Sequence, residues 1–314
     1  MMHPRPSIDF TLGSRRLLSV KRRLARWSFG LEDVLAHQTH AALAPPTPDR
    51  DGLQVLSAPQ SAIPAIIERF PDHLIGARQD YPRHYIAMAG ESFEAYLARF
   101  SGKTRSTLRR KARKLAKDAG GAYHVTEHRT PAEIERFLDA ALPLSARTYQ
   151  ARLLDAGLPD SAAERVAFMG LAEQDRMRAF LLYAGAATKR AADGAPIAYL
   201  ALPIHGQTVV YAHLGYDPDW ARLSPGTVLQ MDALERLFAE ARYRYFDFTQ
   251  GDGAHKAMFG THQTPCASFS LLEPTVANRA LVKARAGFDA AVSGAKALAQ
   301  RSGALGALRS ALRA

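Results

Sequence analysis

The regular alternation of hydrophobic and polar positions begins near residue 121 and changes period along the chain. Apolar positions three or four residues apart predict helices over 131–149, over 162–173 and from 225 onward. Short apolar runs bounded by turn residues predict strands over 122–126, 180–183, 197–202, 208–214, 245–248 and 267–272. With a short helix over 254–259, the order is β-α-α-β-β-β-α-β-α-β. This order predicts an α/β (α+β) fold in which helices flank a mixed central sheet.

Two of these helices begin with recognisable signals. Thr130 and Glu133 have the spacing of a capping box around Pro131. Ser224 is the expected N-cap of the helix that starts at 225, with Pro225 in its first position. A short turn over 205–207 connects two of the strands and predicts a hairpin.

Upstream of residue 121 the pattern is less regular. Strands are expected over 53–56 and 85–89, and helices over 63–70 and 92–100, after a proline-rich linker over 44–52. We predict four parts of the chain: a basic amphipathic tail over 1–31, an N-terminal subdomain over 32–120 that ends in a basic helix, a main domain over 121–274, and a basic Ala/Arg-rich helix or tail over 275–314.

The net charge of +11 is concentrated at the two ends of the chain. Residues 1–31 and 275–314 each hold seven lysines and arginines against one acid, whereas the stretch between them is nearly neutral. In segment 14–27, apolar residues that include Leu24 and Trp27 have helical spacing among basic residues, a pattern that suits an anionic membrane surface. A helix packed on its own domain, or a disordered solubilising tail, explains the same pattern, so these interpretations stay open.

Composition excludes several classes of protein and site. The single cysteine, Cys266, rules out intrachain disulfides and multi-cysteine metal sites, and we expect it to be a buried core thiol in a cytoplasmic protein. The chain contains no run of about 18 apolar residues, so no transmembrane helix is predicted. No apolar region typical of a signal peptide follows the first arginines. The 11 histidines show no metal-ligand spacing, so no metal is expected. G-x-S-x-G, P-loop and G-x-G-x-x-G motifs do not occur.

A strongly basic helix is expected over 103–117. Eight lysines and arginines precede the first acid, Asp118, and Leu108 and Leu115 belong to a single apolar stripe that can dock on the rest of the domain. Such a helix can bind phosphates of a nucleic acid or of a nucleotide ligand. A solvated helix face is the alternative. No aromatic residues interleave with the basic ones, which argues against single-stranded nucleic acid.

The junction over 214–227 leads from a strand, through a loop, into the helix that begins at Pro225. Free backbone N–H groups at such a helix start form an anion site, and Gly226 would let a phosphate approach the backbone closely. Ordinary helix capping by Ser224 accounts for the same residues, so capping and phosphate binding both remain open.

The segment 245–260 is a buried strand, a Gly-Asp-Gly turn and a short helix. Strand ends of this kind are where small-molecule chemistry usually lies in α/β proteins. Asp252 and Lys256 are four residues apart and can form an ion pair that closes the turn. Alternatively, Lys256 binds a phosphate or carboxylate while Asp252 or His255 handles a proton. We rank His255 below the other two.

The element order and three local sequences carry a resemblance to a known family. Residues 121–274 resemble the GNAT N-acyltransferase fold. The sequences 101–111 (SGKTRSTLRRK), 223–227 (LSPGT) and 247–256 (DFTQGDGAHK) are similar to the FemAB-like and CelD-type acyltransferases linked to bacterial surface polysaccharides. Arg222 and Gly226 echo the donor loop of that fold, and His255 occupies a position where the related group commonly has tyrosine. Residues 32–91 would then be a partial N-terminal GNAT-like or helical extension.

The resemblance implies roles for individual residues and an acyl-CoA co-substrate, acetyl-CoA or longer. The splayed strand that ends at 214–216 would offer a backbone donor to the thioester carbonyl, and the amides over 222–227 would hold the pyrophosphate. The implied donor-binding residues are Leu214, Tyr216, Arg222, Ser224, Gly226 and Thr227. The implied substrate-binding residues are Arg109, Arg110, Asp247 and Gln250, and the implied catalytic residues are Asp252 and Lys256.

Three functions are compatible with these residues. The leading hypothesis is an N- or O-acyltransferase that moves an acyl group from acyl-CoA to a small-molecule or saccharide acceptor, peripheral to the inner face of the membrane if the basic ends bind anionic lipid. A FemAB-like transferase that uses aminoacyl-tRNA is the second, and its basic helix and ends would suit tRNA. A non-catalytic scaffold at the membrane, associated with polysaccharide synthesis, is the third.

Overall fold

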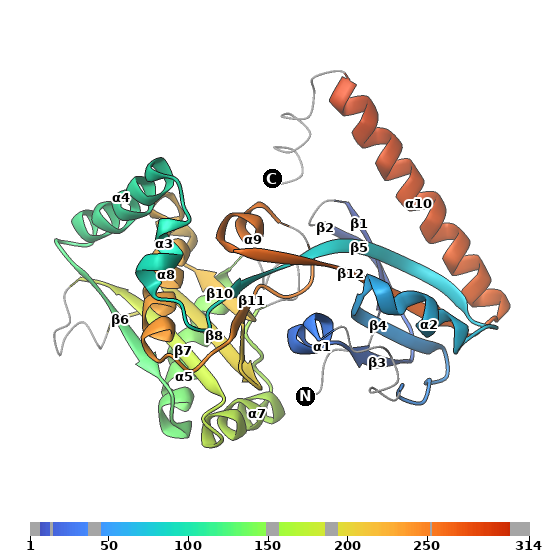
Figure 1. Ribbon diagram of the computed structural model, residues 1–314, viewed down its shortest axis with the longest axis horizontal. Coiled ribbons are helices and arrows are strands. Elements are labelled where there is room, and N and C mark those ends of the chain that lie inside the picture. The colour runs from blue at the N-terminus through green and yellow to red at the C-terminus, as the bar shows by residue number, and fades with distance from the viewer. Residues whose placement is uncertain are drawn as a thin grey trace. The chain divides into compact units, whose positions relative to one another are not determined.

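The computed structural model describes residues 7–12, 15–36, 45–148, 157–185, 194–251 and 253–301. The chain divides into two compact units, which are coloured along the chain in Figure 1. The first unit comprises His84–Gln263, and the second comprises His3–Arg83 together with Thr264–Ala314. These limits differ from the linear boundaries at 31, 120 and 274 expected from the sequence, because the C-terminal segment belongs to the same unit as the N-terminal one.

A mixed sheet forms the centre of the first unit. Its strand order is β5-β11-β9-β8-β7-β6, and β10 also pairs with β8. The strands are β5 (Leu74–Ala87, of which 84–87 belong to this unit), β6 (Tyr123–His128), β7 (Met177–Ala184), β8 (Ala198–His205), β9 (Thr208–Val210), β10 (His213–Tyr216) and β11 (Tyr245–Asp247). Pairing is antiparallel except between β9 and β11, which are parallel and are connected through a helix. The mixed sheet with flanking helices confirms the predicted fold class.

Helices cover both faces of this sheet because its central strands are apolar on both sides. In β7, Phe180 and Leu182 pack with α3 (Phe93–Ala98), α4 (Gly102–Asp118) and α8 (Pro225–Ala239). The alternate residues Ala179 and Leu181 pack with α5 (Pro131–Arg147) and α7 (Ala162–Glu173). Successive side chains of a strand point to opposite faces, so an all-apolar strand requires two covering layers. Figure 1 shows α3, α4 and α8 together on one side of the strands.

The two expected helix starts behave differently. Thr130 Oγ1 accepts the N–H of Glu133, and the Glu133 carboxylate accepts the N–H of Thr130, so the capping box of α5 is confirmed. Ser224 is the N-cap of α8, but its side chain makes no capping hydrogen bond and its backbone is left-handed, with φ 55°. The expected side-chain cap is therefore wrong, because the left-handed backbone that connects α8 to the preceding 3₁₀ turn η2 (Pro218–Leu223) leaves the hydroxyl without a capping bond.

A buried arginine ties β7 to the end of α8. Arg178 is 0% exposed, and its guanidinium donates to Glu240 at 2.9 Å and to Asp175 at 2.7 Å. Arg242 forms a further ion pair with Asp175. A buried cation needs this kind of full pairing, because an uncompensated charge inside the protein is strongly destabilising.

The second unit contains two small sets of strands and three helices among its described residues. Strands β1 (Ser7–Leu12) and β2 (Arg15–Lys21) form an antiparallel pair, and β3 (Leu24–Ser28), β4 (Gly52–Pro59) and β12 (His262–Leu272) pair in that order. The helices are α1 (Leu31–Leu35), α2 (Ile63–Glu68) and α10 (Val276–Arg301), with a 3₁₀ turn η1 (Gln60–Ala62) before α2. Cys266 is buried in the core of this unit, as expected.

Segment 14–27 does not form the helix that its apolar spacing indicated. Residues of this segment form β2 and β3, and Trp27 packs into the core beside Phe29 as part of a strand paired with β4. Leu24 packs against the first turns of α10 through Leu281. The spacing of the apolar residues by three and four positions favours a helix, but pairing with neighbouring strands overrides it. Residues 1–6, 13–14 and 302–314 of the two basic ends lie outside the described residues.

Within the described ranges, no helix is both long and apolar enough to cross a membrane. The same part of the chain brings no three histidine, cysteine, aspartate or glutamate side chains into an arrangement that could hold a metal ion.

Candidate active site

The centre of the candidate site is the place where β9 and β10 separate. The sequence predicted one strand over 208–214, but β9 ends at Val210 and β10 begins at His213. Pairing with β8 shifts by one residue across this break, which is the pattern of a β-bulge. Tyr211 stands at the break, and its N–H still donates to the Asp247 carbonyl of β11 at 2.9 Å. In the described part of the chain, β10 then continues along β8 alone.

The end of β11, on the other side of this break, has a strained backbone. Thr249 has φ 64° and Gly251 has φ 85°, so the chain turns sharply directly after the strand. The left-handed region is unfavourable for a β-branched residue such as threonine, and strain of this kind clusters at functional turns. Asp247 is buried, and its Oδ1 accepts the N–H of Thr249 at 2.9 Å, which fixes the turn.

His255 lies between this turn and α8. It belongs to α9 (Ala254–Phe259), and its Nε2 is 2.7 Å from Oε1 of Gln230 on α8. Its ring stacks on Tyr211, with centroids 6.0 Å apart, and packs on Phe259 at 4.7 Å. The Tyr211 hydroxyl is 3.4 Å from the same Nε2. His255 is therefore oriented from two sides, by a buried amide and by aromatic rings.

The hydrogen bond to Gln230 determines which nitrogen of His255 carries the proton. Because an amide oxygen only accepts, Nε2 carries the hydrogen and Nδ1 keeps its lone pair. Partial burial lowers the pKa of His255, and the charges of Lys111 and Lys256 lower it further. The neutral ring, able to accept a proton at Nδ1, is thus the favoured form near neutral pH. Burial raises the pKa of Tyr211, so its hydroxyl stays protonated.

Gln230 is a polar side chain in an otherwise apolar face of α8. It is 0% exposed, and its Nε2 has no hydrogen-bond partner among the described residues. A buried amide hydrogen left without a partner costs about 1–3 kcal/mol. The retention of such a group beside His255 points to a functional reason for glutamine at this position.

The beginning of α8 forms a second wall of the site. A methyl group on Gly226 would lie 3.0 Å from Leu214 Cδ2 and 3.1 Å from Tyr216 Cδ1, so glycine allows α8 to pack closely on β10. The N–H groups of Ser224 and Thr227 are already used within the backbone, and Pro225 has none. Of the amides over 224–227, that of Gly226 has no backbone partner outside the helix in the described part of the chain, and the residue itself is buried against β10.

A lysine from the basic helix reaches the same wall. Lys111 Nζ on α4 lies 3.5 Å from the Thr227 hydroxyl. A cation, a hydroxyl and the positive end of the α8 dipole together favour an anion here. The sequence placed Lys111 within a basic stretch, and the structure shows that this lysine contacts the start of α8.

The other predicted site residues have different surroundings in the structure. Lys256 Nζ donates to the carbonyl of Gln250, a partner that the sequence did not predict, and its expected ion pair with Asp252 stays a prediction. Asp252, predicted as catalytic, lies outside the described residues. Arg222 is exposed in η2, and Arg110 is exposed on α4. Arg109 points across a pocket that lies between α4 and α8.

Two residues of this site were not identified from the sequence, and a third was ranked low. Tyr211 and Gln230 were read as parts of a strand and a helix, and His255 was ranked below Asp252 and Lys256. The one available signal was the glutamine at 230 in the apolar pattern of α8, since a polar residue on a buried face requires a partner.

Comparison with known families agrees with this geometry. Residues 102–257 match the sequence model of a family described as "Acetyltransferase (GNAT) domain". This segment has a GNAT-like fold. It includes α4, the whole run of strands from β6 to β11, and α9 as far as Ala257. The predicted GNAT-like fold is therefore confirmed for this part of the chain.

Solved structures with similar folds have low sequence identity to this chain. The C-terminal domain of a putative lysylphosphatidylglycerol synthetase from Agrobacterium fabrum is 12% identical, with 75% of this chain and 72% of that one covered and a TM-score of 0.47. L-PGS from Bacillus licheniformis is 12% identical, with coverages of 74% and 72% and a TM-score of 0.46. FemX is 10% identical, with coverages of 70% and 72% and a TM-score of 0.45. Among curated proteins, no match to the chain was found. Similarity at this level does not transfer an activity.

Proposed function

We propose that the first unit is an acyltransferase that moves an acyl group from acyl-CoA to an amine or hydroxyl of a small acceptor, such as a sugar of a cell-surface precursor. The observation that carries the proposal is the His255–Gln230 pair, held at 2.7 Å where β9 and β10 separate, within the segment that matches the GNAT domain. Acyl transfer requires a positioned acceptor, a base for its proton and a donor for the leaving group.

The chemistry follows from the protonation states of two side chains. The acceptor nitrogen or oxygen forms a bond to the acyl carbon and loses its proton to His255 Nδ1. The bond between the acyl carbon and the leaving sulfur breaks, and the sulfur takes a proton from the Tyr211 hydroxyl. The hydroxyl and Nε2 of His255 are 3.4 Å apart, so the proton returns from the imidazolium to the tyrosinate. This leaves His255 with its proton on Nδ1, and proton exchange with solvent water restores the Nε2–H form, so both side chains then return to their starting state.

The start of α8 is the proposed binding site for the donor phosphates. The N–H of Gly226, the Thr227 hydroxyl and Lys111 Nζ provide two hydrogen-bond donors and one cation. This arrangement supports an anion at the helix start, and it is smaller than the run of amides expected over 222–227. Leu214 and Tyr216 line the adjacent edge of β10.

The test combines binding and turnover on the full chain. Acetyl-CoA and longer acyl-CoAs should raise the melting temperature, and thiol release in the presence of amino sugars should follow with a thiol reagent. The only cysteine, Cys266, is buried, so the protein itself contributes little background. Lys111→Gln should weaken acyl-CoA binding, whereas Lys114→Gln, exposed on the same helix, should not. Equal binding by the two variants would remove Lys111 from the donor site.

A different donor is favoured by one feature of α4. Its basic residues Lys103, Arg110 and Arg113 are exposed, and among the described residues none of them forms an ion pair with an acid. An unneutralised cationic helix beside the site suits a polyanion, so aminoacyl-tRNA is the second candidate donor. Its binding would fall steeply with salt, because each neutralised phosphate releases counterions. Transfer from aminoacyl-tRNA without any response to acyl-CoA would decide for it. Binding of anionic vesicles without either response would decide for the scaffold function.

A further inference from the structure

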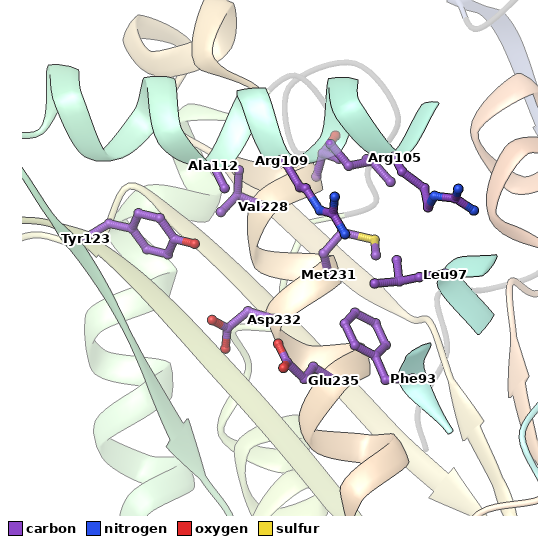
Figure 2. A pocket seen from close by; sticks show the side chains of 12 residues that line it. Phe93, Leu97, Arg105, Arg109, Ala112, Tyr123, Val228, Met231, Asp232 and Glu235 are labelled. Carbon is purple, nitrogen blue, oxygen red and sulfur yellow. The ribbon is translucent and has the colours of Figure 1, made fainter. Parts of the chain in front are cut away.

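A pocket of about 180 Å³ lies in the first unit, and Thr227 at the start of α8 lines it beside the proposed donor site. Four elements enclose it: α3, α4, β6 and α8 (Figure 2). Apolar side chains form most of its lining, among them Leu97, Leu108, Val228 and Met231. Apolar cavities of about 150 Å³ accommodate a benzene ring, so one aromatic ring or one branched aliphatic chain fits this space.

The charged residues of the pocket are divided between its two walls. Arg105 and Arg109 come from α4, and Asp232 and Glu235 come from α8 (Figure 2). Arg105 donates to the carbonyls of Ala98 and Phe100, at 3.2 and 3.1 Å. It is therefore used to close the turn between α3 and α4.

Asp232 also has a partner of its own, because Arg236 donates to it at 2.8 Å. Arg109 and Glu235 differ from these two residues. Among the described residues neither forms a hydrogen bond or an ion pair, although they face the same pocket from opposite walls. The pocket thus holds one available cation and one available carboxylate beside an apolar floor.

A tyrosine contributes a further polar group. Tyr123 of β6 lines the pocket with its ring, and its hydroxyl has no partner in the described part of the chain. Burial and the neighbouring Asp232 and Glu235 carboxylates raise the pKa of Tyr123, so this hydroxyl remains a hydrogen-bond donor and acceptor.

The pocket and the transfer site use different faces of α8. Gln230 faces His255, whereas Met231 and Glu235 lie roughly 100–140° further around the helix, at about 100° per residue. An occupant held by Met231 and Glu235 would therefore not contact His255, although Thr227 borders both the pocket and the proposed donor site.

We propose that this pocket binds a free α-amino acid with an apolar side chain. Its carboxylate would pair with Arg109, its ammonium group with Glu235, and its side chain would lie among Leu97, Val228 and Met231. A simple amine could pair with Glu235 but would leave Arg109 without a partner, and a simple carboxylate could pair with Arg109 but would leave Glu235 without one. A zwitterion satisfies both walls, since opposite charges are each brought to a partner while the apolar group is buried.

The test is calorimetric titration of the full chain with L-phenylalanine and L-leucine. A ligand of this size is expected to bind with a dissociation constant of about 1 mM. Glycine lacks the apolar group, phenethylamine lacks the carboxylate and 3-phenylpropanoate lacks the ammonium group, so each should bind at least tenfold more weakly.

Variants test the two charges separately. Arg109→Gln and Glu235→Gln should each weaken phenylalanine binding at least tenfold, while Arg113→Gln, exposed on α4 outside the pocket, should leave it unchanged. His255→Gln should also leave it unchanged, which separates this proposal from the transfer site. Absence of phenylalanine and leucine binding to the unaltered chain would overturn the proposal. Equal binding of phenethylamine, or unchanged affinity in the two pocket variants, would do the same.

Discussion

Replacing Gln230 by methionine should stabilise the protein while it impairs transfer. Gln230 is fully buried on α8, its Oε1 accepts from His255 and its Nε2 lacks a partner within the described residues. Methionine has similar length and similar helix propensity, so the backbone and packing of α8 should be retained. The substitution removes one buried amide and one hydrogen bond, and little else.

The expected change in the free energy of unfolding follows from two opposing contributions. Relief of the unpaired amide N–H groups contributes about 1–3 kcal/mol, and loss of the bond to His255 costs about 0.5–1.5 kcal/mol. The exposed His255 can bond to water instead. A net gain of about 1 kcal/mol is expected, which corresponds to a rise in melting temperature of about 2–4 °C for a domain of this size.

Activity should change in the opposite direction. Without Gln230 the ring of His255 is no longer held in the tautomer whose Nδ1 accepts a proton. General-base catalysis contributes about 10²–10⁴ in rate, so loss of its orientation should cost roughly tenfold or more in kcat. A group that destabilises the fold and is required for turnover is characteristic of active sites.

The measurements are thermal unfolding by circular dichroism and initial rates of thiol release over a range of pH. Loss of the bond to Oε1 removes an interaction that favours imidazolium, so the acid limb of the kcat profile should move to lower pH in the variant. Leu229→Met is the matched control, since Leu229 is a buried neighbour on α8 whose side chain cannot hydrogen-bond to His255. A fall in melting temperature with unaltered turnover per folded molecule would refute the reasoning and make Gln230 a structural residue.

Three further outcomes are expected. Transfer should require neutral His255, so the acid limb of the pH profile should lie below the ordinary histidine pKa of about 6.5 and vanish in His255→Gln. Gly226→Ala should destabilise the first unit by about 1–3 kcal/mol in urea unfolding, because the added methyl overpacks the contact with β10; unchanged stability would mean that α8 shifts freely. The hydrogen bond from Arg178, together with a second hydrogen bond from Arg242, lowers the pKa of Asp175 to about 2. Its stabilising contribution is complete above about pH 4, the unfolded value, and is lost as pH falls toward 2. Asp175→Asn should therefore weaken the dependence of melting temperature on pH within that window, and an identical pH dependence would contradict the assignment.

Local signals in the sequence predicted the elements of the first unit well. The helix over 162–173 and the short helix over 254–259 have the expected limits, and the capping box at Thr130 is present. Apolar periodicity suffices for such elements because each buries one face against the sheet. The same periodicity was ambiguous in segment 14–27, where strand pairing prevailed over helical spacing.

The candidate site depended on contacts that local patterns do not contain. Lys256 looked like a ligand-binding residue in the sequence, and its donation to the Gln250 carbonyl makes it also the closure of a turn. His255 was the weaker candidate as a single histidine, and it gains its proposed role from Gln230, 25 residues earlier in the chain. No spacing rule connects these two positions, because a separate helix carries each side chain.

The sequence by itself determined the order of helices and strands, the resemblance to GNAT acyltransferases and the concentration of positive charge at the ends of the chain. These properties depend on neighbouring residues and on composition. Only the tertiary structure decided where β9 and β10 separate, which nitrogen of His255 is free, which lysine of α4 reaches α8, and that Arg109 and Glu235 face one pocket. Each of these features depends on contacts between residues that are far apart in sequence. Such contacts are set by how the apolar faces of helices and strands pack together.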